Sequence, residues 1–194
     1  MANSDSGRPL PEAYVRLFGL VGTLKRLNRA GWVEHRVPEV ESVADHSFRL
    51  ALMALFTCSG LDREKLVITA LLHDLCEAVT GDVTPSTMVS AQRKRHDELK
   101  AMQAILIEFD PDGTLLDLWL DFVDGRTPEG RHLAELDKLE MALQALEYSR
   151  QGHPGLREFI DYTAERIATP GNRALLEVIM KEMPASNDAR QGGV

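Results

Sequence analysis

The sequence predicts a single all-α domain, and three observations lead to that expectation. The chain has 194 residues, of which 44% are hydrophobic, enough for one substantial core. Aromatic residues make up only 6% of the chain, while leucine and alanine are plentiful, a balance that favours helices. Apolar residues recur at helical spacing along most of the chain, and no stretch alternates convincingly as a strand would.

In the N-terminal half, the spacing of apolar residues and the capping residues predict three helices. The first begins after the prolines near residue 10, and a loop follows over 29–41. Ser42, with Asp45 three residues later, resembles a capping box and starts a helix that ends near Cys58. Asp62 can cap a helix from Arg63 to about Thr80, which Gly81 would end.

The C-terminal half continues in the same way. Asp110-Pro111-Asp112-Gly113 is a turn. Around it, helices are expected over 88–109, 114–123, 128–150, 154–168 and 172–183. The domain is therefore expected to cover 9–183, between disordered ends at 1–8 and 184–194 that are small and polar.

Composition limits the location and the partners of the chain. The N-terminus has no signal-peptide pattern, and no uncharged apolar run approaches membrane-spanning length, so we expect a cytoplasmic protein without a membrane partner. The two cysteines lack CxxC spacing, which argues against a disulfide scaffold or a zinc ribbon. A net charge of −8 disfavours binding to a nucleic-acid duplex. A small anionic substrate stays possible, because a bound cation reverses the local field.

The stretch HDLCEAVTGD concentrates polar groups within an apolar run. Glu77 is four residues after His73 and three after Asp74, so a helix would place all three on one face. Asp82 follows just beyond a glycine. A His-Asp pair alone more often braces neighbouring helices, but four such groups together favour a site that holds a divalent cation.

Two further residues extend this set. Asp137 shares a stripe with leucines and faces inward, where a lone carboxylate would be destabilising; a buried salt bridge is the alternative interpretation. His46 lies at the start of a predicted helix, where a lone histidine is more often structural. Two histidines and two aspartates without a thiolate suit an octahedral Mn, Fe, Co, Ni or Mg ion better than a structural zinc.

The order His46, His73-Asp74, Asp137 resembles the H…HD…D signature of the HD-domain metal-dependent phosphohydrolases. The contexts LKRLNRAGW, ESVADHS, LLHDLCEAVTGDVTP and LDKLEMALQALEY look like the HD-domain 5′-deoxynucleotidases, which hydrolyse deoxynucleoside 5′-monophosphates. The resemblance covers about residues 14–182 and implies a helical HD-domain bundle with the metal site between helices.

The resemblance also implies roles for individual residues. The metal, expected to be Mn, Co or Mg, would be bound by His46, His73, Asp74 and Asp137. Catalysis would rest on Asp74 and on Glu77, which would position or deprotonate the attacking water. Glu77, Asp82 and the Val83 carbonyl are candidates for a second cation.

Substrate contacts follow from the same resemblance. Trp32 matches the aromatic residue that crowds the sugar 2′ position and favours deoxyribose. The segment that lines the sugar and base corresponds to Asp82, Val83, Thr84 and Pro85. In the bacterial branch an arginine directly precedes the tryptophan and orients the phosphate, but this chain has Gly31 there. Arg29 and Arg36 are the two candidates to replace it.

Two other functions are compatible with the sequence. One is an HD phosphohydrolase that acts on a triphosphate, a cyclic nucleotide or an alarmone, although Lys25, Arg26, Arg29 and Arg36 suffice for one phosphate rather than three. The other is a non-catalytic HD module that binds a nucleotide, for which the complete ligand set and Glu77 would be superfluous. Long apolar helix faces and the resemblance together favour a homodimer.

Overall fold

The computed structural model describes residues 9–184. Over this range the prediction of an all-α fold is confirmed. The described residues contain no strand, and the one β-bridge among them is an isolated pair between Asn28 and Ser42. The predicted disordered stretches fall almost entirely on residues 1–8 and 185–194, outside the described part of the chain. The described residues form one short 3₁₀ helix, Pro85–Thr87, and the α-helices α1 (Pro11–Leu24), α2 (Ala30–Glu34), α3 (Val43–Thr57), α4 (Arg63–Leu72), α5 (Glu77–Thr80), α6 (Ala91–Leu106), α7 (Thr114–Asp124), α8 (Pro128–Arg150), α9 (Arg157–Ala164) and α10 (Pro170–Glu182).

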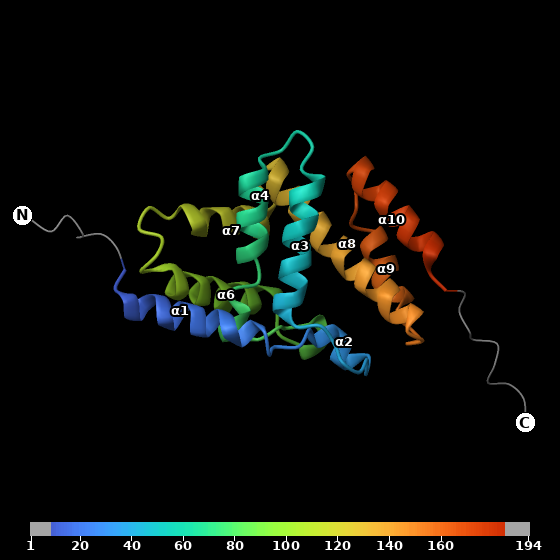
Figure 1. Cartoon of the computed structure of the whole chain (residues 1–194), viewed down its shortest axis with the longest axis horizontal. Helices are drawn as coiled ribbons and strands as arrows, with labels where there is room; N and C mark the ends of the chain where they lie inside the picture. The colour runs from blue at the N-terminus through green and yellow to red at the C-terminus, as the bar shows by residue number, and fades with distance from the viewer. Residues whose placement is uncertain (1–8, 185–194) are drawn as a thin grey trace, which may run out of the picture.

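The bundle is organised around α3 and α8, which contact each other (Figure 1). Helix α4 packs along α3, while α7, α9 and α10 pack against α8. The main core includes Leu50 of α3 and the α8 leucines Leu133, Leu136 and Leu139, all without exposed surface. A second core forms around Trp119 and Met102. No helix of the described range has both the length and the apolar character needed to cross a membrane.

The predicted capping box at the start of α3 is confirmed. Asp45 N–H donates to the Ser42 hydroxyl at 3.1 Å, and Ser42 N–H donates to the Asp45 carboxylate at 2.9 Å. These bonds satisfy helix N–H groups that have no partner within the helix. The capping box therefore fixes the first turn of α3, and His46 follows directly after it.

The predicted continuous helix from Arg63 to Thr80 is wrong, because α4 ends at Leu72 and α5 begins at Glu77. Across the interruption, backbone hydrogen bonds join residues that are three apart instead of four. Leu75 N–H donates to Leu72 O, and Glu77 N–H donates to Asp74 O. The Trp119 indole N–H donates to the His73 carbonyl at 3.0 Å, which gives that carbonyl a partner outside the helix. The HD pair thus lies in a tight turn between two helices, rather than on a helix face.

Other boundaries differ by a few residues. Helix α8 spans its predicted range, while α6, α9 and α10 differ at their ends from the predicted 88–109, 154–168 and 172–183. The predicted loop 29–41 contains α2, a helix of five residues. Such a short helix is not stable by itself, so its N–H groups and side chains must find partners elsewhere.

The junction between α7 and α8 requires a glycine. A Cβ at Gly130 would lie 2.5 Å from the backbone oxygen of Asp121, closer than atoms can approach. The Asp121 carboxylate accepts Thr127 N–H at 2.7 Å, and Thr127 caps α8. This close contact fixes where α8 begins, and hence where Asp137 lies along it.

Candidate functional site

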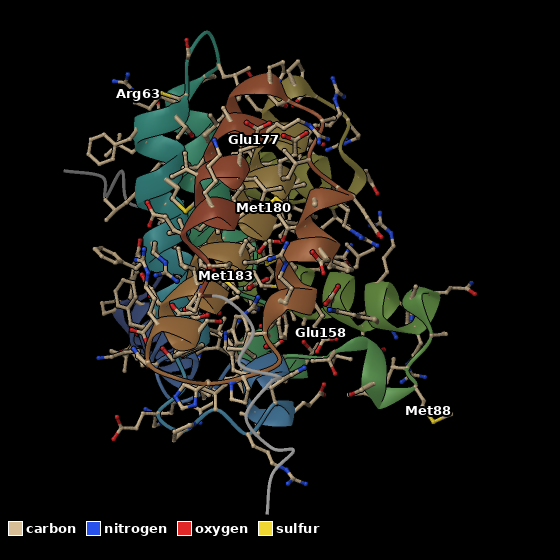
Figure 2. The ribbon with its side chains drawn as sticks, turned by 90° about the vertical axis from the view of Figure 1, so that its right-hand side faces the viewer. Arg63, Met88, Glu158, Glu177, Met180 and Met183 are labelled. Atoms are coloured by element: carbon tan, nitrogen blue, oxygen red, sulfur yellow. The ribbon has the colours of Figure 1, made fainter. Side chains whose placement is uncertain are left out.

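A cavity of about 710 Å³ opens between α2, the turn after α4, α8 and α9. Asp74, Glu77, Asp82 and Asp137 line the part of the cavity called here the acidic end, and Trp32, Phe159 and Tyr162 line the part called the aromatic wall. Figure 2 labels Glu158, which lies on α9 above α2 and accepts a 2.5 Å hydrogen bond from His35 across the cavity rim. The residues used below that line the cavity are Arg29, Trp32, His73, Asp74, Glu77, Asp82, Val83, Thr84, Lys94, Glu98, Asp137, Lys138, Phe159 and Tyr162.

Four donor atoms of the predicted metal ligands converge at the acidic end. His46 Nε2 lies 3.2 Å from His73 Nε2 and 3.2 Å from Asp137 Oδ1. Asp74 Oδ2 lies 3.0 Å from His73 Nε2 and 3.7 Å from His46 Nε2. The structure therefore contains a possible metal site at His46, His73 and Asp74, with Asp137 beside it. Two imidazole nitrogens and hard carboxylate oxygens are a fitting donor set for a divalent cation.

The electrostatics of this cluster favour positive charge. Burial and the Arg29 charge lower the pKa of His46, but Glu140 and Asp137 outweigh them and raise it to about 10. Burial raises the pKa of Asp74, yet His73 and Arg29 hold it well below its usual range. Buried anions that stabilise a proton so strongly will stabilise a divalent cation in its place.

Glu77 lies nearby with unused bonding capacity. Its side chain is buried, and its Oε2 atom has no hydrogen-bond partner among the described residues. Burial, Asp74 and Asp82 raise the pKa of Glu77 to about 10. A buried oxygen without a partner is rare in folded proteins, and at a cavity it often marks a functional group.

Arg29 is a basic group at the acidic end. Its guanidinium lies 3.2 Å from Asp74 Oδ2 and 3.6 Å from Asp82 Oδ2. Burial alone would lower the pKa of Arg29, but the charges of Asp74 and Asp82 outweigh this effect and raise the pKa above its usual value. The guanidinium is therefore charged. Arg36, the other predicted candidate, is exposed at a positive φ of 55° and does not line the cavity.

The segment 82–86 is attached to α2 at both ends. Asp82 Oδ2 accepts Ala30 N–H at 2.8 Å and so caps α2. Glu34 accepts 2.5 Å hydrogen bonds from the hydroxyls of Thr84 and Ser86. Pro85 begins the 3₁₀ helix. The Val83 carbonyl accepts Lys94 Nζ at 3.0 Å, so two of the three groups predicted for a second cation already face basic side chains. A second cation there stays a prediction.

Trp32 forms part of the aromatic wall, with only 2% of its surface exposed. Its ring centroid lies 4.3 Å from that of Phe159 and 5.4 Å from that of Tyr148. Its indole N–H donates to Glu41 Oε1 at 2.8 Å. These contacts hold the ring in one orientation at the cavity wall.

The sequence prediction missed three kinds of residue. Lys138 Nζ lies 2.8 Å from Asp137 Oδ2 at the acidic end, and its position directly after Asp137 was the only signal. Phe159 and Tyr162 reach the cavity from α9, for which the sequence offered no signal. Glu140 lies behind His46, and its place on the Asp137 stripe gave a weak signal.

The fold and the site define an HD-domain protein, and comparison with known proteins agrees. Residues 21–173 match the HD domain family, and the chain belongs to that family. The resemblance noted in the sequence is thereby confirmed.

Curated relatives are similar over most of their length. The Mus musculus protein named 5′-deoxynucleotidase HDDC2 is 36% identical over 191 residues, which cover 96% of this chain and 94% of that protein. The Homo sapiens protein of the same name is 38% identical, covering 80% and 79%. Among solved structures, a conserved hypothetical protein from Pyrococcus furiosus matches with a TM-score of 0.70 and 33% identity, over 87% of this chain and 98% of that one.

Proposed function

We propose that this protein hydrolyses deoxyribonucleoside 5′-monophosphates to a deoxynucleoside and phosphate. The observation that carries this proposal is the convergence of His46, His73, Asp74 and Asp137 beside Glu77 at one end of a cavity. The cavity volume of about 710 Å³ is sufficient for one nucleotide. The names of the mouse and human relatives support the same reaction.

His46, His73, Asp74 and Asp137 would hold a divalent cation, with Mn, Co and Mg as the candidates. The cation, when bound, supplies positive charge that neutralises phosphoryl oxygens and acidifies water. Asp74 would be shared between the cation and Arg29, which its Oδ2 atom approaches at 3.2 Å.

Glu77 would accept the proton of the attacking water. Its Oε2 atom is buried and has no partner among the described residues. The positive charge of a bound cation would lower the pKa of Glu77, so that its carboxylate would be ionised and able to receive a proton. Hydrolysis of phosphate monoesters is extremely slow in water, so removal of this base should be costly.

Gly31 stands where the bacterial branch has a phosphate-binding arginine, so two other basic groups would bind the phosphate here. Arg29 lies 3.2 Å from Asp74, and Lys138 lies 2.8 Å from Asp137. Arg36 is excluded from this role by its exposed position away from the cavity. Guanidinium and ammonium groups are the usual partners of phosphate oxygens.

The sugar and base would lie toward the aromatic wall. Trp32 would crowd the 2′ position of the sugar. Its ring could not move aside for a 2′-hydroxyl, because contacts with Phe159 and Glu41 hold it in place. Asp82, Val83, Thr84 and Pro85 would form the side of the site that adjoins α2.

The experiment that tests this function is phosphate release from ribo- and deoxyribonucleoside mono- and triphosphates, with Mn, Co and Mg compared. We expect turnover of deoxyribonucleoside monophosphates, dependent on the cation and abolished by a chelator. Turnover of triphosphates only would contradict the proposal, and equal rates with AMP and dAMP would contradict the role of Trp32. Binding of dAMP without phosphate release would favour the non-catalytic module.

Replacing Glu77 by glutamine removes the base while keeping the shape of the side chain. We expect kcat to fall by about 100-fold or more, with the cation content unchanged by elemental analysis. Glu98→Gln is the matched control, because Glu98 also lines the cavity but pairs with Lys94 at 3.5 Å. A Glu77→Gln protein that retained its cation and turned over dAMP at the wild-type rate would exclude the proton-accepting role.

Replacing Lys138 by methionine tests the phosphate contact. We expect kcat/KM for dAMP to fall by about tenfold, in line with the loss of one charged hydrogen bond. Arg36→Met is the control and should leave kcat/KM unchanged. The opposite pattern in steady-state kinetics, with Arg36 sensitive and Lys138 neutral, would overturn the assignment.

We also propose that the protein is a homodimer, which α3 would help to form. Phe48, Leu52 and Phe56 are spaced four residues apart along α3, and 65%, 39% and 81% of their surfaces are exposed. A helix stripe of this kind gains from contact with a second copy. Light scattering coupled to size exclusion should give twice the chain mass for the wild type and a lower mass for Phe56→Glu; a wild-type mass of one chain would reject the dimer.

The cytoplasm is the proposed compartment. Cys58 and Cys76 are free and buried, as expected where thiols are kept reduced. Imaging of the tagged protein in its native cell should give a cytoplasmic signal, and an organellar signal would contradict this location.

A further inference from the structure

A second polar cluster lies directly behind the donor atoms, on the far side of the His46 ring. His46 Nδ1 lies 2.5 Å from Glu140 Oε2, and neither side chain has any exposed surface. Glu140 is three residues after Asp137 on α8, so the two acids reach opposite edges of the same imidazole. His46 is therefore held between two carboxylates from one helix.

The other oxygen of Glu140 is also used. Arg49 Nε donates to Glu140 Oε1 at 2.7 Å, and Arg49 comes from α3, three residues after His46. The remaining nitrogens of Arg49 bond to Gln144 and, at 2.9 Å, to Glu147. A buried carboxylate with both oxygens paired in this way has little freedom to move.

This arrangement decides which ring nitrogen of His46 faces the acidic end. With Nδ1–H donated to Glu140, the Nε2 atom is turned toward His73, Asp74 and Asp137. A histidine that ligates a metal commonly donates its other N–H to a carboxylate, which fixes the ring orientation and raises its basicity as a ligand.

Glu41, His46 and Glu140 also lie close enough together to suggest a separate cation site. Arg49 already places its guanidinium there, 2.6 Å from Glu140 and 3.7 Å from Glu41 Oε2. The positive charge that these acids need is thus supplied by the chain itself, and the cluster acts as support for His46.

We propose that Glu140 is a positioning residue, which together with Arg49 orients His46 so that its Nε2 atom can bind the cation. The same arginine connects this support to the cavity wall, because Glu41 accepts the indole N–H of Trp32 at 2.8 Å. The proposal rests on the proposed function, since it assumes that the acidic end holds a divalent cation.

The test compares Glu140→Gln with Glu147→Gln. Both changes neutralise a carboxylate that accepts from Arg49, but Glu147 is partly exposed and does not contact His46. Affinity for Mn²⁺ or Co²⁺ is measured by competition with a chromophoric chelator. We expect Glu140→Gln to weaken binding by about 10–100-fold, and Glu147→Gln to change it by less than about threefold.

Proton NMR supplies a readout that a general loss of stability would not imitate. In the wild-type protein the His46 Nδ1 proton should be shifted downfield and protected from exchange with water, because it lies in a short buried hydrogen bond. In Glu140→Gln it should move upfield and exchange faster, whereas Glu147→Gln should leave it in place.

The outcomes separate the two proposals. If the wild type binds the cation and Glu140→Gln binds it equally well, the positioning role is wrong while the proposed function stands. If the wild type binds no divalent cation, the proposed function itself fails. Should Glu140→Gln not fold, rapid exchange of the Nδ1 proton in the wild type would still overturn the positioning role.

Discussion

The burial of His46 among carboxylates is the constraint on which the rest of the structure depends. Asp74, Asp137 and Glu140 all approach this one ring, which has no exposed surface. Negative charge inside a helical core is destabilising unless positive charge lies next to it. The chain supplies three cations from three elements: Arg29 before α2, Arg49 on α3 and Lys138 on α8.

This requirement explains several features that would otherwise look unrelated. The capping box fixes the first turn of α3 and with it His46, and the glycine at the α7–α8 junction fixes the register of α8 and with it Asp137. The turn after α4 directs His73 and Asp74 to the same point. Each local feature is ordinary, but together they bring ligand atoms of His46, His73 and Asp74, from distant parts of the chain, to within 4.8 Å of one another.

The sequence was sufficient for the class of fold and for much of the site. Helix periodicity and capping residues act locally, so α3 and α8 could be located from the sequence alone. The four residues predicted as metal ligands could be named as candidates because their types and order are distinctive. Where the donor atoms lie relative to one another, however, depends on how α3, α4 and α8 pack.

What the sequence could not provide were the contacts made across the bundle. The interruption at His73 depends on the indole of Trp119, which is 46 residues away. The choice between Arg29 and Arg36 depends on where their side chains lie: Arg29 is beside Asp74 and Asp82 in the cavity, whereas Arg36 does not line it. Likewise, Glu140 is only three residues after Asp137, but it is the packing of α3 against α8 that joins it to His46 and Arg49.

Helix α2 has a consequence for the design of altered specificity. It is only five residues long, and it is held by Asp82 at its first residue, by Glu41 through Trp32 and by Thr84 and Ser86 through Glu34. A helix of this length has almost no stability of its own, so it folds only as part of the wall that it completes. The width of the cavity is therefore a shared property of three separate segments. An engineer who changes Trp32 alone will alter the anchoring of the whole wall, and a selective redesign has to alter its partners together with it.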